Sequence, residues 1–158
     1  MHKINLRRAL AAAATLALVA VAGSAQPASN PRFGHWKLKS DAPAPQSNIM
    51  SYEPYNGKGM TVTIDQVNKD GSATKWGYNT MFDGKDEPLY GNPGQDTGSV
   101  RVITPAINEI VYKKGGKVVQ VLVNVLSPDG QKLGITYFRQ NAEGKTTGVT
   151  FATYEKMN

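Results

Sequence analysis

This sequence contains no cysteine and only two histidines among its 158 residues. The lack of cysteine excludes disulfides, thiolate catalysis and thiolate zinc sites. His2 falls in an N-terminal leader, so His35 is the one histidine left to a processed chain. A single histidine cannot build a histidine metal cluster, and strand alternation places His35 opposite Trp36, facing outward. We therefore expect no catalytic residues, no metal site and no cofactor.

The acidic residues are not paired on any predicted inner face, where a hydrolase would need two carboxyl groups. Most lie in predicted turns, where an aspartate can accept hydrogen bonds from its own turn backbone. Residues 83–96 hold four acids that could supply oxygen ligands to calcium. Their spacing matches no known calcium loop, and Lys85 lies among them, so we expect a solvated loop.

Long apolar runs are also scarce, and the longest one lies near the N-terminus. Lys3, Arg7 and Arg8 precede the apolar residues 9–22, which are followed by the small residues Gly23-Ser24-Ala25. This order is typical of a signal peptide, and the run is too short to span a membrane stably. We expect residues 1–25 to be removed, 26–32 to form a flexible tail, and the mature protein to be periplasmic or extracellular without membrane insertion.

The positive charge is modest once that leader is set aside. The chain has 18 Lys and Arg against 12 Asp and Glu, a net charge of +6. The leader holds three of the basic residues and no acid, which leaves 15 against 12, a net charge of +3. The remaining basic residues are dispersed over turns and strand ends. Nucleic-acid binding requires a concentrated basic surface, so we expect no nucleic-acid partner.

The rest of the chain alternates short β patterns with turn residues and contains no amphipathic helical window. The predicted strands are 33–38, 47–53, 60–67, 73–82, 88–90, 99–104, 107–113, 117–127, 132–140 and 146–156. Strand 47–53 is the most polar, which is compatible with an edge or a seam. Regular spacing with tight turns predicts an all-β domain over residues 33–158, a single antiparallel up-and-down β-barrel of about 8–10 strands.

Three consecutive strands at the C-terminal end carry the clearest alternation. One side of 117–127 presents four valines, and the next two strands present Leu133, Ile135 and Tyr137, and Val149, Phe151 and Thr153. Faces of this kind are buried on one side of an antiparallel sheet. Six aromatic residues fall on the apolar faces of their strands: Trp36, Trp76, Tyr78, Phe82, Tyr137 and Phe151.

Gly34-His35-Trp36 at the start of the first strand resembles the Gly-x-Trp opening of the lipocalins. The chain is similar to uncharacterised lipocalin-like proteins exported by bacteria, through this opening, the segment 112–119 and the terminal Tyr154-Glu155-Lys156. The resemblance implies a calycin-type β-barrel with one open end, a tryptophan at the closed end and a small apolar ligand inside. The cysteines, C-terminal helix and Thr-Asp-Tyr motif of typical lipocalins are absent, so it implies the fold more strongly than transport.

The six aromatic residues are the candidate ligand-binding residues. Inside a small barrel such rings either fill the interior or line a pocket for one ligand, and the sequence leaves both outcomes open. The favoured hypothesis is an exported barrel that binds a small, largely apolar molecule. The alternative is an envelope interaction or structural module with a solid core, acting through lysine-bearing turns and an open edge at 47–53.

Overall fold

The computed structural model describes residues 29–39 and 45–158. The predicted signal peptide, residues 26–28 of the predicted tail and the connector 40–44 lie outside these ranges. The described part of the chain forms ten strands: β1 (Gly34–Lys39), β2 (Ser47–Tyr55), β3 (Gly59–Val67), β4 (Ala73–Thr80), β5 (Glu87–Pro88), β6 (Thr97–Thr104), β7 (Ile107–Lys114), β8 (Lys117–Leu126), β9 (Lys132–Gln140) and β10 (Thr146–Lys156). Within those residues, no helix has the length and apolarity needed to cross a membrane.

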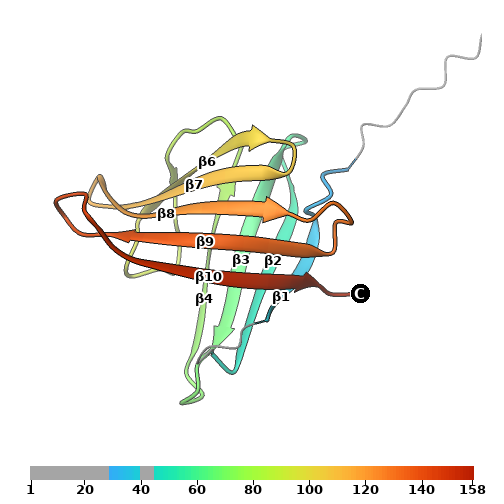
Figure 1. Cartoon of the computed structure of the whole chain (residues 1–158), viewed down its shortest axis with the longest axis horizontal. Coiled ribbons are helices and arrows are strands. Elements are labelled where there is room, and N and C mark those ends of the chain that lie inside the picture. Colours follow the sequence, from blue (N-terminus) through green and yellow to red (C-terminus); the bar gives the residue numbers. More distant parts are fainter. Residues whose placement is uncertain (1–28, 40–44) are drawn as a thin grey trace, which may run out of the picture.

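All ten strands belong to one antiparallel sheet in the order β4-β3-β2-β1-β10-β9-β8-β7-β6-β5. Neighbours in this order are also neighbours in sequence, except that β1 pairs with β10, the first strand with the last. β4 and β5 follow one another in the chain but stand at the two ends of the order. Figure 1 shows β6 to β10 crossing in front of β1 to β4, as expected for a sheet rolled on itself. The predicted single antiparallel up-and-down β-barrel is therefore confirmed.

The barrel closes beside β4, where Gly77 meets Tyr90 after the short strand β5. The amide of Gly77 donates to the Tyr90 carbonyl at 3.1 Å, and the Tyr90 amide donates back at 3.0 Å. A Cβ at position 77 would lie 2.3 Å from the Val62 carbonyl oxygen and 2.4 Å from the Tyr90 hydroxyl. Glycine is therefore required for this close approach.

The strand predicted as a possible edge is internal. β2 pairs along its length with β3 and over residues 49–52 with β1, so the middle of the strand has a neighbour on both sides. The hypothesis of an open edge at 47–53 is therefore wrong. Its polar composition has another cause, because Asn48 and Tyr52 point into the barrel interior.

The inner face differs from the predicted one in two of the last three strands. In β9, Leu133 and Ile135 are buried as expected. In β8 the buried residues are Leu122, Asn124 and Leu126, so Val121, Val123 and Val125 lie on the outer face. Of the four predicted valines, Val119 packs against the core.

In β10 the buried aromatic side chain is Tyr154. Phe151 is 77% exposed, so its predicted inward orientation is wrong. It lies on the outer face in register with Thr136 of β9, which pairs with Val123 of β8. The outer face of these strands also carries apolar residues, so the hydrophobicity pattern does not show which face of the sheet is buried.

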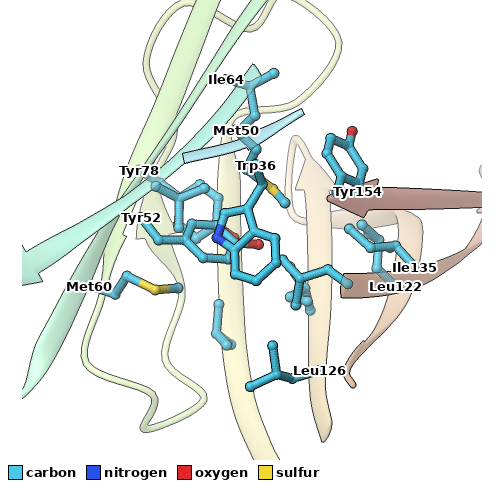
Figure 2. Close-up of a cluster of buried hydrophobic side chains, with 14 of the residues drawn as sticks. Trp36, Met50, Tyr52, Met60, Ile64, Tyr78, Leu122, Leu126, Ile135 and Tyr154 are labelled. Carbon is cyan, nitrogen blue, oxygen red and sulfur yellow. The ribbon is translucent and has the colours of Figure 1, made fainter. Parts of the chain in front are cut away.

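One end of the barrel is closed by Trp36 and its neighbours, in agreement with the lipocalin resemblance. Trp36 is fully buried, and its Nε1 donates to the Arg32 carbonyl at 2.8 Å. The Arg32 guanidinium donates to the carbonyls of Pro105 and Ala106, in the turn between β6 and β7. The ammonium group of Lys156 lies 5.3 Å from the centre of the Trp36 ring. Figure 2 shows Trp36 among side chains from both halves of the barrel.

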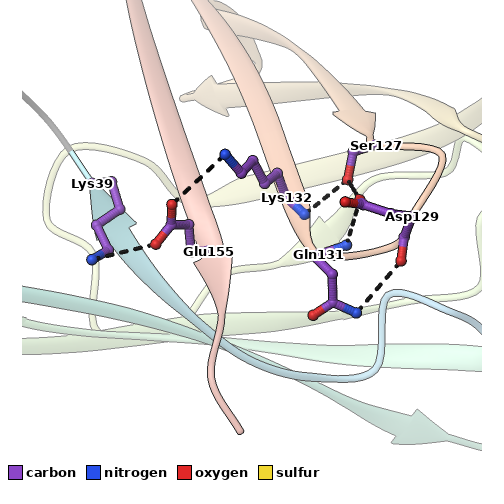
Figure 3. Close-up of polar contacts among 6 residues, drawn as sticks. All are labelled: Lys39, Ser127, Asp129, Gln131, Lys132 and Glu155. Atoms are coloured by element: carbon purple, nitrogen blue, oxygen red, sulfur yellow. Dashed lines mark hydrogen bonds and ion pairs between the residues drawn. The ribbon is translucent and has the colours of Figure 1, made fainter.

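The outer surface near this end carries turn hydrogen bonds and exposed ion pairs. Ser127 and Gln131 both donate to the Asp129 carboxylate, and the Ser127 hydrogen bond is the main cause that lowers the pKa of that group. Glu155 of β10 lies 3.3 Å from Lys39 and 3.9 Å from Lys132, so it links three neighbouring strands (Figure 3). Exposed pairs of this kind contribute little to stability, so the buried interior dominates.

Candidate ligand-binding cavity

A cavity of about 240 Å³ lies inside the barrel, toward the end opposite Trp36. Its lining contains five tyrosines, one tryptophan, six aliphatic or methionine side chains and six amides. The residues are Tyr52, Tyr78, Tyr112, Tyr137, Tyr154, Trp76, Met50, Val62, Ile64, Ile110, Leu122, Ile135, Asn48, Gln66, Asn92, Gln95, Gln120 and Asn124. None of these described lining residues is charged at neutral pH. The cavity wall is therefore a mixture of apolar and neutral polar groups.

Three of the six predicted residues line this cavity: Trp76, Tyr78 and Tyr137. Trp36 lies below it, at the closed end. Phe82 has a positive φ of 61° and borders a different hollow, together with Arg32 and Asn108. Phe151 is on the outer surface. The prediction therefore identified part of the lining and missed the remaining tyrosines and all six amides.

One wall of the cavity is an aromatic group from β4 and β7. The ring of Tyr112 meets Trp76 and Tyr78 edge to face, with ring centres 5.8 Å apart in both pairs. The Tyr112 hydroxyl also donates to the Tyr78 hydroxyl at 3.3 Å. Edge-to-face contacts and this hydrogen bond hold the three rings in fixed orientations, which gives a ligand a preformed wall.

The cavity mouth is bordered by amide side chains that bond one another. On one side the Tyr154 hydroxyl donates to Asn48, and the Asn48 amide donates to Gln66 at 2.9 Å. On the other side the Gln95 amide donates to Gln120 at 3.1 Å. Gln95 belongs to the loop after β5, so this bond ties the loop to β8 across the mouth. The rim is polar but carries no formal charge.

Burial keeps the cavity tyrosines protonated. Removal from solvent is the main cause that raises the pKa of Tyr78 to about 12, and the hydrogen bond from Tyr112 acts in the opposite direction. Burial likewise raises the pKa of Tyr52, Tyr112, Tyr137 and Tyr154. These hydroxyls are therefore neutral donors and acceptors at physiological pH, not anions.

Alkaline pH is expected to unfold the protein through these tyrosines. Below about pH 10 both folded and unfolded phenols are protonated and the free energy of unfolding is insensitive to them. From about pH 10 to 12 the unfolded chain ionises while Tyr78 stays protonated, so the unfolded state binds fewer protons and stability falls. Tyr78 alone should remove about 1.4 kcal/mol per pH unit in this window. Denaturant titrations at stepped pH, read with tyrosinate absorbance, test this; cavity tyrosines that ionise near pH 10 in a fully folded protein would contradict it.

No family model matches the chain, and neither does any curated protein. Two similar solved structures are those of the fluorescent protein UnaG. The wild-type structure is 16% identical, with a TM-score of 0.54, over 79% of this chain and 96% of that one. The structure of a mutant of the same protein is 17% identical, with a TM-score of 0.52, over 78% of this chain and 94% of that one. Identities this low establish a shared calycin-type barrel and nothing finer.

Proposed function

We propose that this protein is exported and that its barrel binds one small, neutral, largely apolar molecule in the interior cavity. The observation that carries the proposal is the cavity lining: eighteen side chains that combine aromatic and aliphatic walls with amides and hydroxyls and include no charged group. The likeness to a fluorescent calycin-type barrel supports the fold on which this depends. Export is supported by the leader-like N-terminal sequence.

The absence of lining charges sets the class of ligand. A charged ligand that enters such a cavity loses its hydration without gaining an ion partner, which is strongly unfavourable. A flat apolar molecule instead gains contact with the Trp76, Tyr78 and Tyr112 rings. One or two polar atoms on that ligand can be satisfied by tyrosine hydroxyls or amides, as is usual in small-molecule pockets.

Two probes with the same ring skeleton test this preference. N-phenyl-1-naphthylamine is neutral, and 8-anilinonaphthalene-1-sulfonate adds a sulfonate to the same rings. We expect the neutral probe to bind saturably, one per protein, with a dissociation constant in the micromolar range. The sulfonate should bind at least about tenfold more weakly. Either its charge is buried without an ion partner, or it stays in solvent and the rings cannot enter the cavity fully. Probe fluorescence reports both titrations.

The proposal fails if the neutral probe shows no saturable binding to the folded protein. It also fails if the sulfonate binds as tightly as the neutral probe, since the uncharged lining would then not determine ligand choice. Competition between the two probes shows whether they share one site.

The surface of the barrel supports a second candidate function, an envelope interaction module. β2 offers no open edge for a partner, because it pairs with both β1 and β3. The outer face does present Phe151, Val149 and Val125, each more than 40% exposed. A partner captured from envelope extract by the wild-type protein, lost with Phe151→Ser and retained with a blocked cavity, would favour the module.

We also propose a non-catalytic role. His35 is exposed on β1, and its Nδ1 lies 2.8 Å from the Ser51 hydroxyl, on the outside of the barrel. In the described residues, no group of three metal-ligating side chains comes together. Any activity that His35→Ala abolishes would overturn this proposal.

A further inference from the structure

We propose that the ligand bears a hydrogen-bond donor, an O–H or N–H group, that is received by the Asn124 carboxamide oxygen inside the barrel. This inference rests on the proposed function. It narrows the class of ligand from neutral apolar molecules to those whose ring system carries an O–H or N–H group. The inference follows from the hydrogen bonding of one buried amide and one buried phenol.

Asn124 has an acceptor that nothing in the described chain uses. Its side chain is 2% exposed and belongs to the cavity lining. Its Nδ2 donates to the Tyr52 hydroxyl at 3.2 Å, which fixes the orientation of the amide. Its Oδ1 is buried and has no hydrogen-bond partner. A buried acceptor without a partner is destabilising, and native proteins retain very few of them.

Tyr52 supplies the complementary group. Its hydroxyl oxygen accepts the hydrogen bond from Asn124, so that bond does not use the phenol proton. The two side chains therefore offer a free acceptor and a donor next to each other. A ligand hydroxyl can accept from Tyr52 and donate to Asn124 at the same time, which satisfies both groups.

Apart from Tyr52 and the cross-strand partner Asn108 on β7, the neighbours of Asn124 are apolar. Its inward neighbours on β8 are Leu122 and Leu126, and its cross-strand partner on β9 is the buried Ile135. A leucine at position 124 would continue this apolar row without an unpaired oxygen. A polar group placed at a cost to stability inside a cavity is typical of a binding site.

A matched pair of ligands tests the inference without any mutation. 2-Naphthol and 2-methoxynaphthalene share one ring system and one oxygen acceptor, but only the naphthol has a proton to donate. We expect the wild-type protein to bind 2-naphthol about tenfold more tightly at neutral pH, because the ether leaves the Asn124 oxygen unpaired. Competition against bound N-phenyl-1-naphthylamine gives both affinities.

The Asn124→Leu variant should remove that preference. The side chain keeps a similar size and loses the acceptor, so the two naphthalenes should bind with nearly equal affinity, and the ether should bind at least as well as it does to the wild type. Asn108→Leu is the matched control: Asn108 is also buried and pairs with Asn124 across β7 and β8, but it is not in the cavity lining. That variant should keep the preference.

The outcomes separate this inference from the function on which it rests. Saturable binding of N-phenyl-1-naphthylamine with equal wild-type affinities for the two naphthalenes, or with a preference for the ether, overturns the inference alone. A preference for 2-naphthol that persists in folded Asn124→Leu also overturns it. If no neutral probe binds the folded wild-type protein, the proposed function fails and the inference fails with it. Because the wild-type comparison uses no variant, a folding defect in Asn124→Leu does not remove the test.

Discussion

Trp36→Ala is expected to lower the free energy of unfolding by about 3–5 kcal/mol, the range for removing a fully buried large aromatic side chain. Trp36 is 0% exposed at the closed end of the barrel. The substitution leaves a cavity beneath β1. It also removes the hydrogen bond to the Arg32 carbonyl and the ring over which the Lys156 ammonium lies. Denaturant unfolding followed by circular dichroism measures the loss.

Phe151→Ala is the control for this prediction. Like Trp36, Phe151 is an aromatic residue in a strand of alternating polarity. It is 77% exposed, so its loss should change the free energy of unfolding by no more than about 0.5 kcal/mol. Equal destabilisation by the two substitutions would contradict the placement of Trp36 inside and Phe151 outside. A large loss of stability in Phe151→Ala alone would place Phe151 inside the barrel and Trp36 outside.

Leu122→Trp is expected to weaken binding of N-phenyl-1-naphthylamine by about a hundredfold or more, equivalent to ~2.7 kcal/mol. Leu122 lies on β8, is 5% exposed and lines the cavity. An indole at this position occupies the space that the probe needs. Because that space is open in the wild type, the cost of overpacking should remain within about 1–3 kcal/mol, so the barrel stays folded. Titration of the folded variant with the probe measures the effect.

Val125→Trp is the matched control on the same strand. Val125 lies on the outer face and is 41% exposed, so an indole there points into solvent and leaves the cavity unchanged. The variant should bind the probe as the wild type does. If Val125→Trp blocked binding and Leu122→Trp did not, the probe site would be on the outer face.

The strands and turns were largely predictable from the sequence, because period-two alternation and glycine-bearing turns are local properties. The up-and-down topology followed from short connections between consecutive strands. The closure of the barrel between Gly77 and Tyr90 was not predictable, since it depends on two backbone segments that the local pattern does not relate. Trp36 was placed through its position at the start of the first strand.

The choice of inner face failed where both faces of a strand are apolar. In β10, Val149 and Phe151 are more hydrophobic than the even-numbered residues, yet Tyr154 is the buried one. Glu155 shares the odd-numbered face with Phe151 and forms ion pairs in solvent, and this charge could have identified the outer side. In β8 the polarity pattern is misleading, because Asn124 is buried while Val121, Val123 and Val125 lie on the outer face.

The amides of the cavity lining could not be identified by patterns that equate polar residues with solvent. Asn48, Gln66 and Gln120 alternate like surface residues but line the interior. There Asn48 bonds Gln66 and the Tyr154 hydroxyl, and Gln120 accepts from Gln95. An uncharged polar interior violates the simple inside–outside rule, and such violations are expected at binding sites. Sequence reasoning therefore found three of the six aromatic residues of the cavity lining and missed the other three tyrosines and the amides.

Side-chain methyl NMR of the protein during titration with N-phenyl-1-naphthylamine tests the central claim most directly. If the interior is the binding site, the methyl resonances of Ile110, Leu122 and Ile135 should shift saturably, while those of Val125 and Val149 on the outer face should stay unchanged. Shifts confined to the outer valines, or a neutral probe that leaves the interior methyl groups unperturbed at saturation, would contradict the account.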